Sequence, residues 1–94
     1  MFVIRNIFKC KPGQAKNVIE RLQAAMTLMP ETSQRILVDH VADFWTVVLE
    51  IEVESVAAFE EQFQEYGRRE DVQKAMTGYL DSVTSGRREI YRIV

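Results

Sequence analysis

Apolar positions along the chain switch between a two-residue period, typical of strands, and a spacing of three to four residues, typical of helices. The strand-like segments are rich in Phe, Ile and Val, and Pro or Gly residues stand at most of the transitions. The pattern predicts a strand at 2–10, a helix from Ala15 to Met29, strands at 34–41 and 44–53, a helical region from Val56 to Val83 with a bend at 67–71, and a strand at 87–94.

This β-α-β-β-α-β order predicts an α+β, ferredoxin-like fold in which residues 1–94 form a single domain. Right-handed crossovers in that order place both helical regions on one face of a four-stranded antiparallel sheet. The first and third strands are then central in the sheet.

The two central strands carry more apolar residues than one covered face requires. One face of the third strand is apolar throughout: Trp45, Val47, Leu49, Ile51 and Val53. The first strand is apolar on both faces, with Phe2, Ile4 and Phe8 on one and Val3 and Ile7 on the other. Helices cover only one face, so the second face, where Phe44 and Val48 also lie, needs another cover. We expect a homodimer in which two copies pack sheet against sheet.

The composition argues against several classes of partner. The chain has 12 Lys and Arg against 14 Asp and Glu, and its net charge of −2 is not that of a typical nucleic-acid-binding protein. No apolar run has the length of a membrane span. Cys10 is the sole cysteine, so no intramolecular disulfide can form. We expect a cytoplasmic protein whose partners include neither nucleic acid nor membrane.

Two polar residues are weak candidates for catalysis. Asn6 stands between Ile4 and Phe8 on a central strand, where an unpaired amide would cost about 1–3 kcal/mol. Its partner is therefore either a neighbouring protein group or a ligand. His40 is the only histidine, and it is either a partly exposed residue on an outer strand or a general base in a pocket. With Cys10 it falls short of a zinc ligand set, so we expect no metal and no cofactor.

Aromatic residues at helical and strand spacing suggest a second kind of site. They either fill a plain core or line an apolar cavity between the helices and the sheet. The candidate ligand-binding residues are Asn6, Trp45, Phe63, Tyr66 and Tyr79.

Three stretches carry a resemblance to a known group of proteins: "KCKPGQAKNVIERL", "ESVAAFEEQF" and "SGRREIYRIV". With these, the whole chain resembles the dimeric α+β barrel superfamily, which includes NIPSNAP-like, antibiotic-biosynthesis-monooxygenase-like and stress-responsive barrel domains. The resemblance implies two ferredoxin-like sheets that form one barrel in a homodimer. The superfamily includes cofactor-free oxygenases, isomerases and haem-degrading enzymes, so it leaves the activity open.

The haem-degrading branch of that superfamily resembles this sequence at Asn6 but departs from it elsewhere. The resemblance calls for a Trp and an iron-ligating His on the second helical region. Phe59 and Phe63 stand where the Trp is expected, and the later stretch VQKAMTGYL contains no His. A haem iron would therefore lack its proximal ligand, which disfavours haem degradation.

Three functional interpretations follow. The first is a homodimer that binds a small apolar molecule or a partner without catalysis. The second is a cofactor-independent monooxygenase or isomerase acting on a cyclic or quinol-like substrate. In that case Asn6 would orient the substrate or oxygen, Trp45 and Tyr66 would wall the pocket, and His40 would accept a proton. The third is a structural interaction module.

Overall fold

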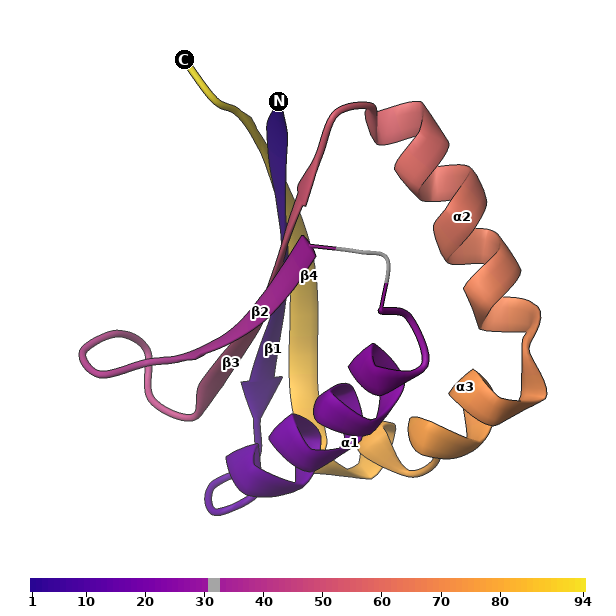
Figure 1. Cartoon of the computed structure of the whole chain (residues 1–94). Helices are drawn as coiled ribbons and strands as arrows, with labels where there is room; N and C mark the ends of the chain where they lie inside the picture. Colours follow the sequence, from indigo (N-terminus) through magenta and orange to yellow (C-terminus); the bar gives the residue numbers. More distant parts are fainter. Residues whose placement is uncertain (31–32) are drawn as a thin grey trace.

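One four-stranded antiparallel sheet is covered on one side by helices (Figure 1). The computed structural model describes residues 1–30 and 33–94. The elements are β1 (Phe2–Cys10), α1 (Ala15–Thr27), β2 (Ser33–Val38), β3 (Thr46–Val53), α2 (Val56–Arg68), α3 (Glu70–Ala75), the 3-10 helix η1 (Tyr79–Ser82) and β4 (Val83–Arg92). The sheet order is β2-β3-β1-β4, so β1 and β3 are central. The predicted α+β, ferredoxin-like fold is confirmed.

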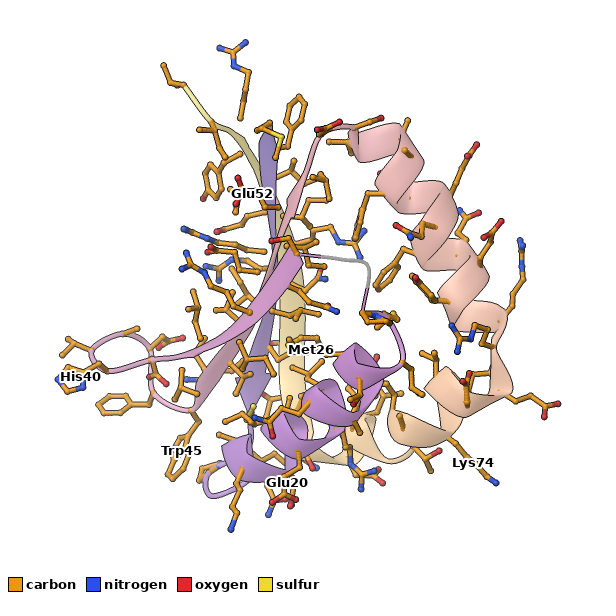
Figure 2. The ribbon with its side chains drawn as sticks, viewed as in Figure 1. Glu20, Met26, His40, Trp45, Glu52 and Lys74 are labelled. Atoms are coloured by element: carbon orange, nitrogen blue, oxygen red, sulfur yellow. The ribbon has the colours of Figure 1, made fainter. Side chains whose placement is uncertain are left out.

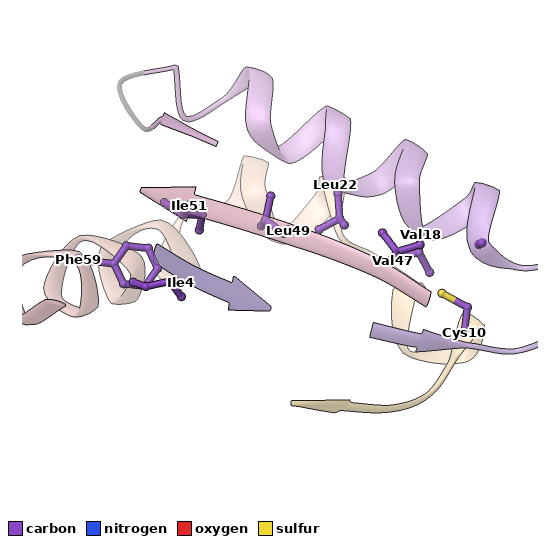
Figure 3. Close-up of a cluster of buried hydrophobic side chains, with 9 residues drawn as sticks. Ile4, Cys10, Val18, Leu22, Val47, Leu49, Ile51 and Phe59 are labelled. Carbon is purple, nitrogen blue, oxygen red and sulfur yellow. The ribbon is translucent and has the colours of Figure 1, made fainter. Parts of the chain in front are cut away.

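The core lies between the helices and the helix-facing side of β1 and β3. Ile4 of β1, Val18 of α1 and Val47 of β3 are fully buried, and Cys10 is almost so. Figure 3 shows these side chains with Leu22, Leu49, Ile51 and Phe59 in one apolar cluster. The alternation in β3 and the helical spacing in α1 place these residues on facing surfaces, as the sequence predicts.

The second helical region is divided into three parts rather than two. The predicted bend is present, because Arg69 is extended and separates α2 from α3. After α3, Gly78 adopts a left-handed conformation with φ of 84° and is followed by η1. Glycine takes this conformation at little cost, so it sets the change of direction into β4.

β4 is longer than predicted. It begins at Val83, whereas the sequence pattern placed its start at residue 87, after a break at Gly86. Gly86 instead pairs with Phe8 of β1 inside the sheet. A Cβ atom at Gly86 would lie 3.3 Å from the backbone oxygen of Ile7, so this glycine permits a close approach of the two strands.

The connection between β2 and β3 is longer than predicted. β2 ends at Val38 and β3 begins at Thr46, which leaves Phe44 and Trp45 outside the sheet. Both have positive φ values, 42° and 51°, which end strand geometry. The backbone N–H of Cys10 donates to the oxygen of Trp45 at 2.8 Å, and this bond holds the turn against β1.

Candidate functional site

A cavity of about 650 Å³ lies between the sheet and the helices. In Figure 1, α2 stands apart from the sheet. The helices α1 and α3 contact each other and close the lower part of the helical layer in this view. Residues of β1, β3 and β4 form one wall of the cavity, and residues of α1, α2, α3 and η1 form the other. Small-molecule sites commonly have volumes of about 300–1,000 Å³, so the size is that of a ligand pocket.

The cavity wall is mostly apolar. Its helical side includes Leu22, Ala25, Met26, Met29, Val72 and Met76. Met26 lies between α1 and the sheet in Figure 2. Methionine side chains are flexible and polarisable, so such a wall can adapt to ligands of different shape.

Aromatic side chains complete the wall. Phe8 and Tyr79 meet edge to face, with ring centroids 6.1 Å apart. Tyr66 is buried, and its hydroxyl accepts a hydrogen bond from the Gln62 amide at 3.4 Å. Phe63 is 38% exposed and lies with its ring centroid 5.3 Å from that of Phe59. The aromatic rings therefore extend from the buried interior of the cavity to its exposed rim.

Asn6 and Arg88 form the polar part of the wall. Asn6 is 8% exposed, and its side-chain oxygen accepts a hydrogen bond from Arg88 Nε at 2.7 Å. The guanidinium of Arg88 also lies over the rings of Phe63 and Phe59, at 5.3 and 6.0 Å from their centroids. Such cation–π contacts hold a guanidinium in place on an apolar surface. The partner that buried Asn6 requires is therefore a protein side chain.

Arg88 is a site residue that the sequence pattern did not identify. Asn6 and Arg88 are directly paired across β1 and β4, so their side chains share the helix-facing side of the sheet. The neighbouring Arg87 points to the opposite face, as alternation along a strand requires. Only the strand register distinguishes the two arginines, and no local pattern in the sequence indicates that register.

The structure brings four of the five predicted ligand-binding residues together. Asn6, Phe63, Tyr66 and Tyr79 all line the cavity. Trp45 does not, because the positive φ at this position places it in the loop after β2, where it is 44% exposed. Trp45 is therefore not part of the wall of this cavity, and its role in ligand binding stays a prediction.

His40 is also remote from the cavity. It is exposed in the same loop, and Figure 2 shows it at the tip of that loop, which projects away from the helices. The role of a general base in this cavity is therefore not available to His40. His40 is exposed, but it follows β2 and does not lie on an outer strand as the alternative expected.

The second face of the sheet carries a row of alternating charges. Arg35, Glu50, Arg5 and Glu89 are paired in turn across β2, β3, β1 and β4. The Glu50 carboxylate accepts from Arg5 Nε at 2.9 Å and from Arg35 Nε and Nη2 at 2.9 and 2.5 Å. These bonds, that of Arg35 first, lower the pKa of Glu50 although burial acts to raise it. The face is thus polar in this row, and its charges are largely neutralised.

Beside that row lies an apolar one. Leu37, Val48 and Ile7 are directly paired across β2, β3 and β1, and all three side chains are partly exposed. Phe44, expected here, lies in the loop instead and is 77% exposed. The second face therefore combines an apolar row with an internally paired charged row.

Residues 1–30 and 33–94 contain neither a cluster of metal-ligating side chains nor a helix that could span a membrane. No group of three or more His, Cys, Asp and Glu side chains is arranged to hold a metal ion. No helix in the same residues combines the length and the apolar character that crossing a membrane requires.

No protein-family model and no curated protein matches the sequence. Solved structures, in contrast, resemble the fold closely. A NIPSNAP domain protein from Burkholderia xenovorans aligns over 100% of this chain and 95% of its own, with a TM-score of 0.85 and 9% identity. A NIPSNAP family protein from Agrobacterium tumefaciens aligns over 99% and 92%, with a TM-score of 0.83 and 10% identity.

An antibiotic biosynthesis monooxygenase is also similar. Its structure aligns over 100% of this chain and 99% of its own, with a TM-score of 0.73 and 14% identity. The resemblance to NIPSNAP-like and monooxygenase-like domains is thus confirmed at the level of the fold. At these identities a shared fold does not transfer an activity. The features that bear on function are the cavity and the open face, which is the second face of the sheet that no helix covers.

Proposed function

We propose that the protein is a homodimer that binds a small, largely apolar molecule in the cavity between its sheet and its helices. The observation that carries the proposal is the cavity itself, whose volume of about 650 Å³ is lined mostly by apolar and aromatic side chains. Asn6 and Arg88 supply the few converging polar groups that orient a ligand in such sites.

The chemistry of the cavity wall favours binding over acid–base catalysis. No Asp, Glu, His or Cys is among the described residues that line it. These are the side chains that most often transfer protons or attack substrates in enzymes. The remaining polar groups donate hydrogen bonds and position a ligand.

Native mass spectrometry of the protein purified from its own host tests this function. We expect a dimer that carries a reproducible additional mass, which is lost when the protein is denatured. A bare dimer whose cavity takes up no small apolar compound would contradict ligand binding. It would favour the structural interaction module instead.

A second candidate is a cofactor-independent monooxygenase or isomerase acting on a cyclic, quinol-like substrate. Its specific support is the pair of Asn6 and Arg88, whose N–H groups could stabilise an oxyanion that forms on the substrate. A similar fold in an antibiotic biosynthesis monooxygenase adds to this support. Oxygen consumption with a panel of quinols tests it. Turnover that is unchanged in Asn6→Ala would remove the catalytic role of Asn6, and no turnover by the native protein would remove the candidate.

The homodimer is supported by the open face of the sheet. Its apolar row of Leu37, Val48 and Ile7 is continuous across three strands. The adjacent charges pair with one another within the sheet, so covering them leaves no isolated ion. A second copy of the same face offers matching apolar and charged rows, and the two-fold arrangement is the commonest in oligomers.

Sedimentation equilibrium of two matched variants tests the dimer. Leu37→Asp puts a carboxylate into the apolar row, so we expect it to convert dimer into monomer. Leu80→Asp is the control, because Leu80 is 68% exposed on η1, on the helical side of the molecule. A monomeric native protein, or equal effects of both variants, would refute the open face as the interface.

A cytoplasmic location is part of the same proposal. It rests on the sole cysteine, Cys10, which is a free and buried thiol. Reducing compartments preserve such thiols. Fractionation of host cells with detection of the intact protein tests the location, and recovery from a secreted fraction would contradict it.

A further inference from the structure

Among the described residues that line the cavity, Arg88 is the arginine whose guanidinium lies on the helix-facing side of the sheet, where it contacts Asn6, Phe63 and Phe59. Arg87 also contributes to the lining, but its residue pairs with Ile7 on the open face and its side chain forms an ion pair with Glu89 at 3.1 Å. Within the described residues Arg88 has no carboxylate partner, and no Asp or Glu lines the cavity. The cavity wall therefore carries a positive charge that the described residues do not neutralise.

The guanidinium of Arg88 is held in a fixed orientation. Its Nε donates to the side-chain oxygen of Asn6 at 2.7 Å, and its Cζ lies 5.3 and 6.0 Å from the ring centroids of Phe63 and Phe59. Its two terminal nitrogens have no acceptor among the described residues. The Asn6 amide nitrogen likewise has no acceptor among the described residues, although Asn6 is buried with only 8% of its surface exposed. Three donor nitrogens are thus left for a ligand at the place where the sheet meets the cavity.

The chemistry of these donors selects an anion. A guanidinium recognises a carboxylate or a delocalised oxyanion through its two-pronged donor geometry, and such charge-assisted bonds are stronger than neutral ones. Arg88 is itself exposed, whereas the methionines and tyrosines of the wall lie deeper. A ligand that matches both the exposed guanidinium and the deeper apolar wall has an anionic end at the rim of the cavity and an apolar body inside it.

We infer that the cavity binds an amphipathic monoanion, with its carboxylate or enolate oxygens on Arg88 and Asn6 and its apolar body against Met26, Met29 and Met76. This inference rests on the proposed ligand-binding function and specifies the chemical class of the ligand. It assigns to Arg88 the selection of anionic over neutral ligands.

Two matched pairs of probes test the selection. The first pair is octanoate, an anion, and 1-octanol, its neutral partner with the same aliphatic body. The second pair is 2-hydroxy-1,4-naphthoquinone, an enolate anion near neutral pH, and neutral 1,4-naphthoquinone, which has the same fused ring. Titrations followed by ¹H–¹⁵N NMR report affinity together with the side-chain signals of Asn6 and Arg88. We expect the anion of at least one pair to bind about tenfold or more tightly than its neutral partner and to shift those two signals. Whichever anion binds better distinguishes a carboxylate ligand from an enolate one.

Two variants one residue apart supply the control. Arg88→Gln is expected to remove the preference for the anion and to leave the affinity for the neutral partner within about threefold. Arg87→Gln makes the same change of charge on the other face of β4 and is expected to keep the preference. Should Arg88→Gln fail to fold, the native protein still provides a test, because added salt should weaken binding of the anion and spare the neutral compound.

The outcomes separate this inference from the proposed function. Equal affinities within each pair, or equal losses in Arg87→Gln and Arg88→Gln, would overturn anion selection while ligand binding in the cavity stands. If none of the four probes binds to the native protein, the anion inference fails. The native mass measurement then decides whether ligand binding fails with it.

Discussion

Glu50 offers the sharpest test of how the open face is held together. Its side chain is only 9% exposed although it lies on the face without helices, because the side chains of Arg5 and Arg35 cover it. The variant Glu50→Gln keeps the shape of the side chain and removes its charge. One arginine then keeps an oxygen acceptor, while the other faces an NH₂ group that cannot accept.

The expected loss follows from these contacts. Hydrogen bonds to charged groups each contribute roughly 1.5–3 kcal/mol, and here three N–H groups share one carboxylate. The arginine side chains are 42% and 70% exposed, so water compensates part of the loss. We therefore expect the free energy of unfolding at pH 7 to fall by roughly 1–3 kcal/mol.

The effect should depend on pH in a defined direction. The bonds from Arg35 and Arg5 lower the pKa of Glu50 from its ordinary value of 4.5. A carboxyl group with a lowered folded-state pKa stabilises the protein fully above the unfolded-state pKa. That contribution is lost as the pH falls through the folded-state value. The difference between the native protein and Glu50→Gln should thus be largest near neutral pH and should shrink below pH 4.5.

Urea unfolding followed by circular dichroism measures this difference at one fixed protein concentration, since dimerisation would make stability depend on concentration. Glu52→Gln is the matched control, because Glu52 lies on the same strand and face, is exposed, and is not in the ion pairs of Glu50. Its effect should stay within about 0.5 kcal/mol. Equal effects of the two variants at pH 7, or a Glu50→Gln effect that persists unchanged at acid pH, would refute the reasoning.

Three further predictions concern the core and a helix start. Ser55→Ala should lower the free energy of unfolding by about 0.5–2 kcal/mol in thermal or urea unfolding, because Ser55 Oγ accepts the Ala58 N–H at 3.2 Å and caps α2. An unchanged free energy of unfolding would argue against the cap. Ile4→Ala should cost about 2–5 kcal/mol, since Ile4 is fully buried, whereas Ile93→Ala, at 46% exposure, should cost far less. Burial in the first place, and the nearby Asp39 carboxylate in the second, raise the pKa of the Cys10 thiol. A thiol-specific reagent should therefore label Cys10 only as the protein opens. Labelling of the native protein as fast as that of the protein unfolded in urea would contradict this burial.

Local pattern predicted the elements that local chemistry controls. Alternation in residues 2–10 and helical spacing from Ala15 onward each produced an element at the expected place. Ser55 begins α2, as its capping chemistry requires. The order of these elements limited the topology to a sheet with β1 and β3 at its centre, because crossover handedness leaves few alternatives.

The same pattern predicted the wrong strand bounds at positions where contacts across the sheet outweigh the local preference of the residue. Trp45 continues the alternation of the third strand in the sequence, yet a positive φ removes it from the sheet. Gly86 has the composition of a break, yet it fits inside β4 because the strands approach closely there. In both cases the outcome depends on a neighbour distant in sequence, so a local pattern cannot report it.

The residues of the candidate site also fall into those that the sequence pattern indicates and one that only the tertiary structure identifies. Asn6 and the aromatic residues Phe63, Tyr66 and Tyr79 could be selected from the sequence, because a polar residue on a central strand and aromatics on a buried helix face are visible as patterns. The role of Arg88 could not, since two adjacent arginines are equivalent until the register with β1 assigns one to each face. The sequence by itself determined which residues could form a pocket. The tertiary structure decided which cation faces that pocket, because only strand pairing fixes the direction of a side chain relative to residues far away in the chain.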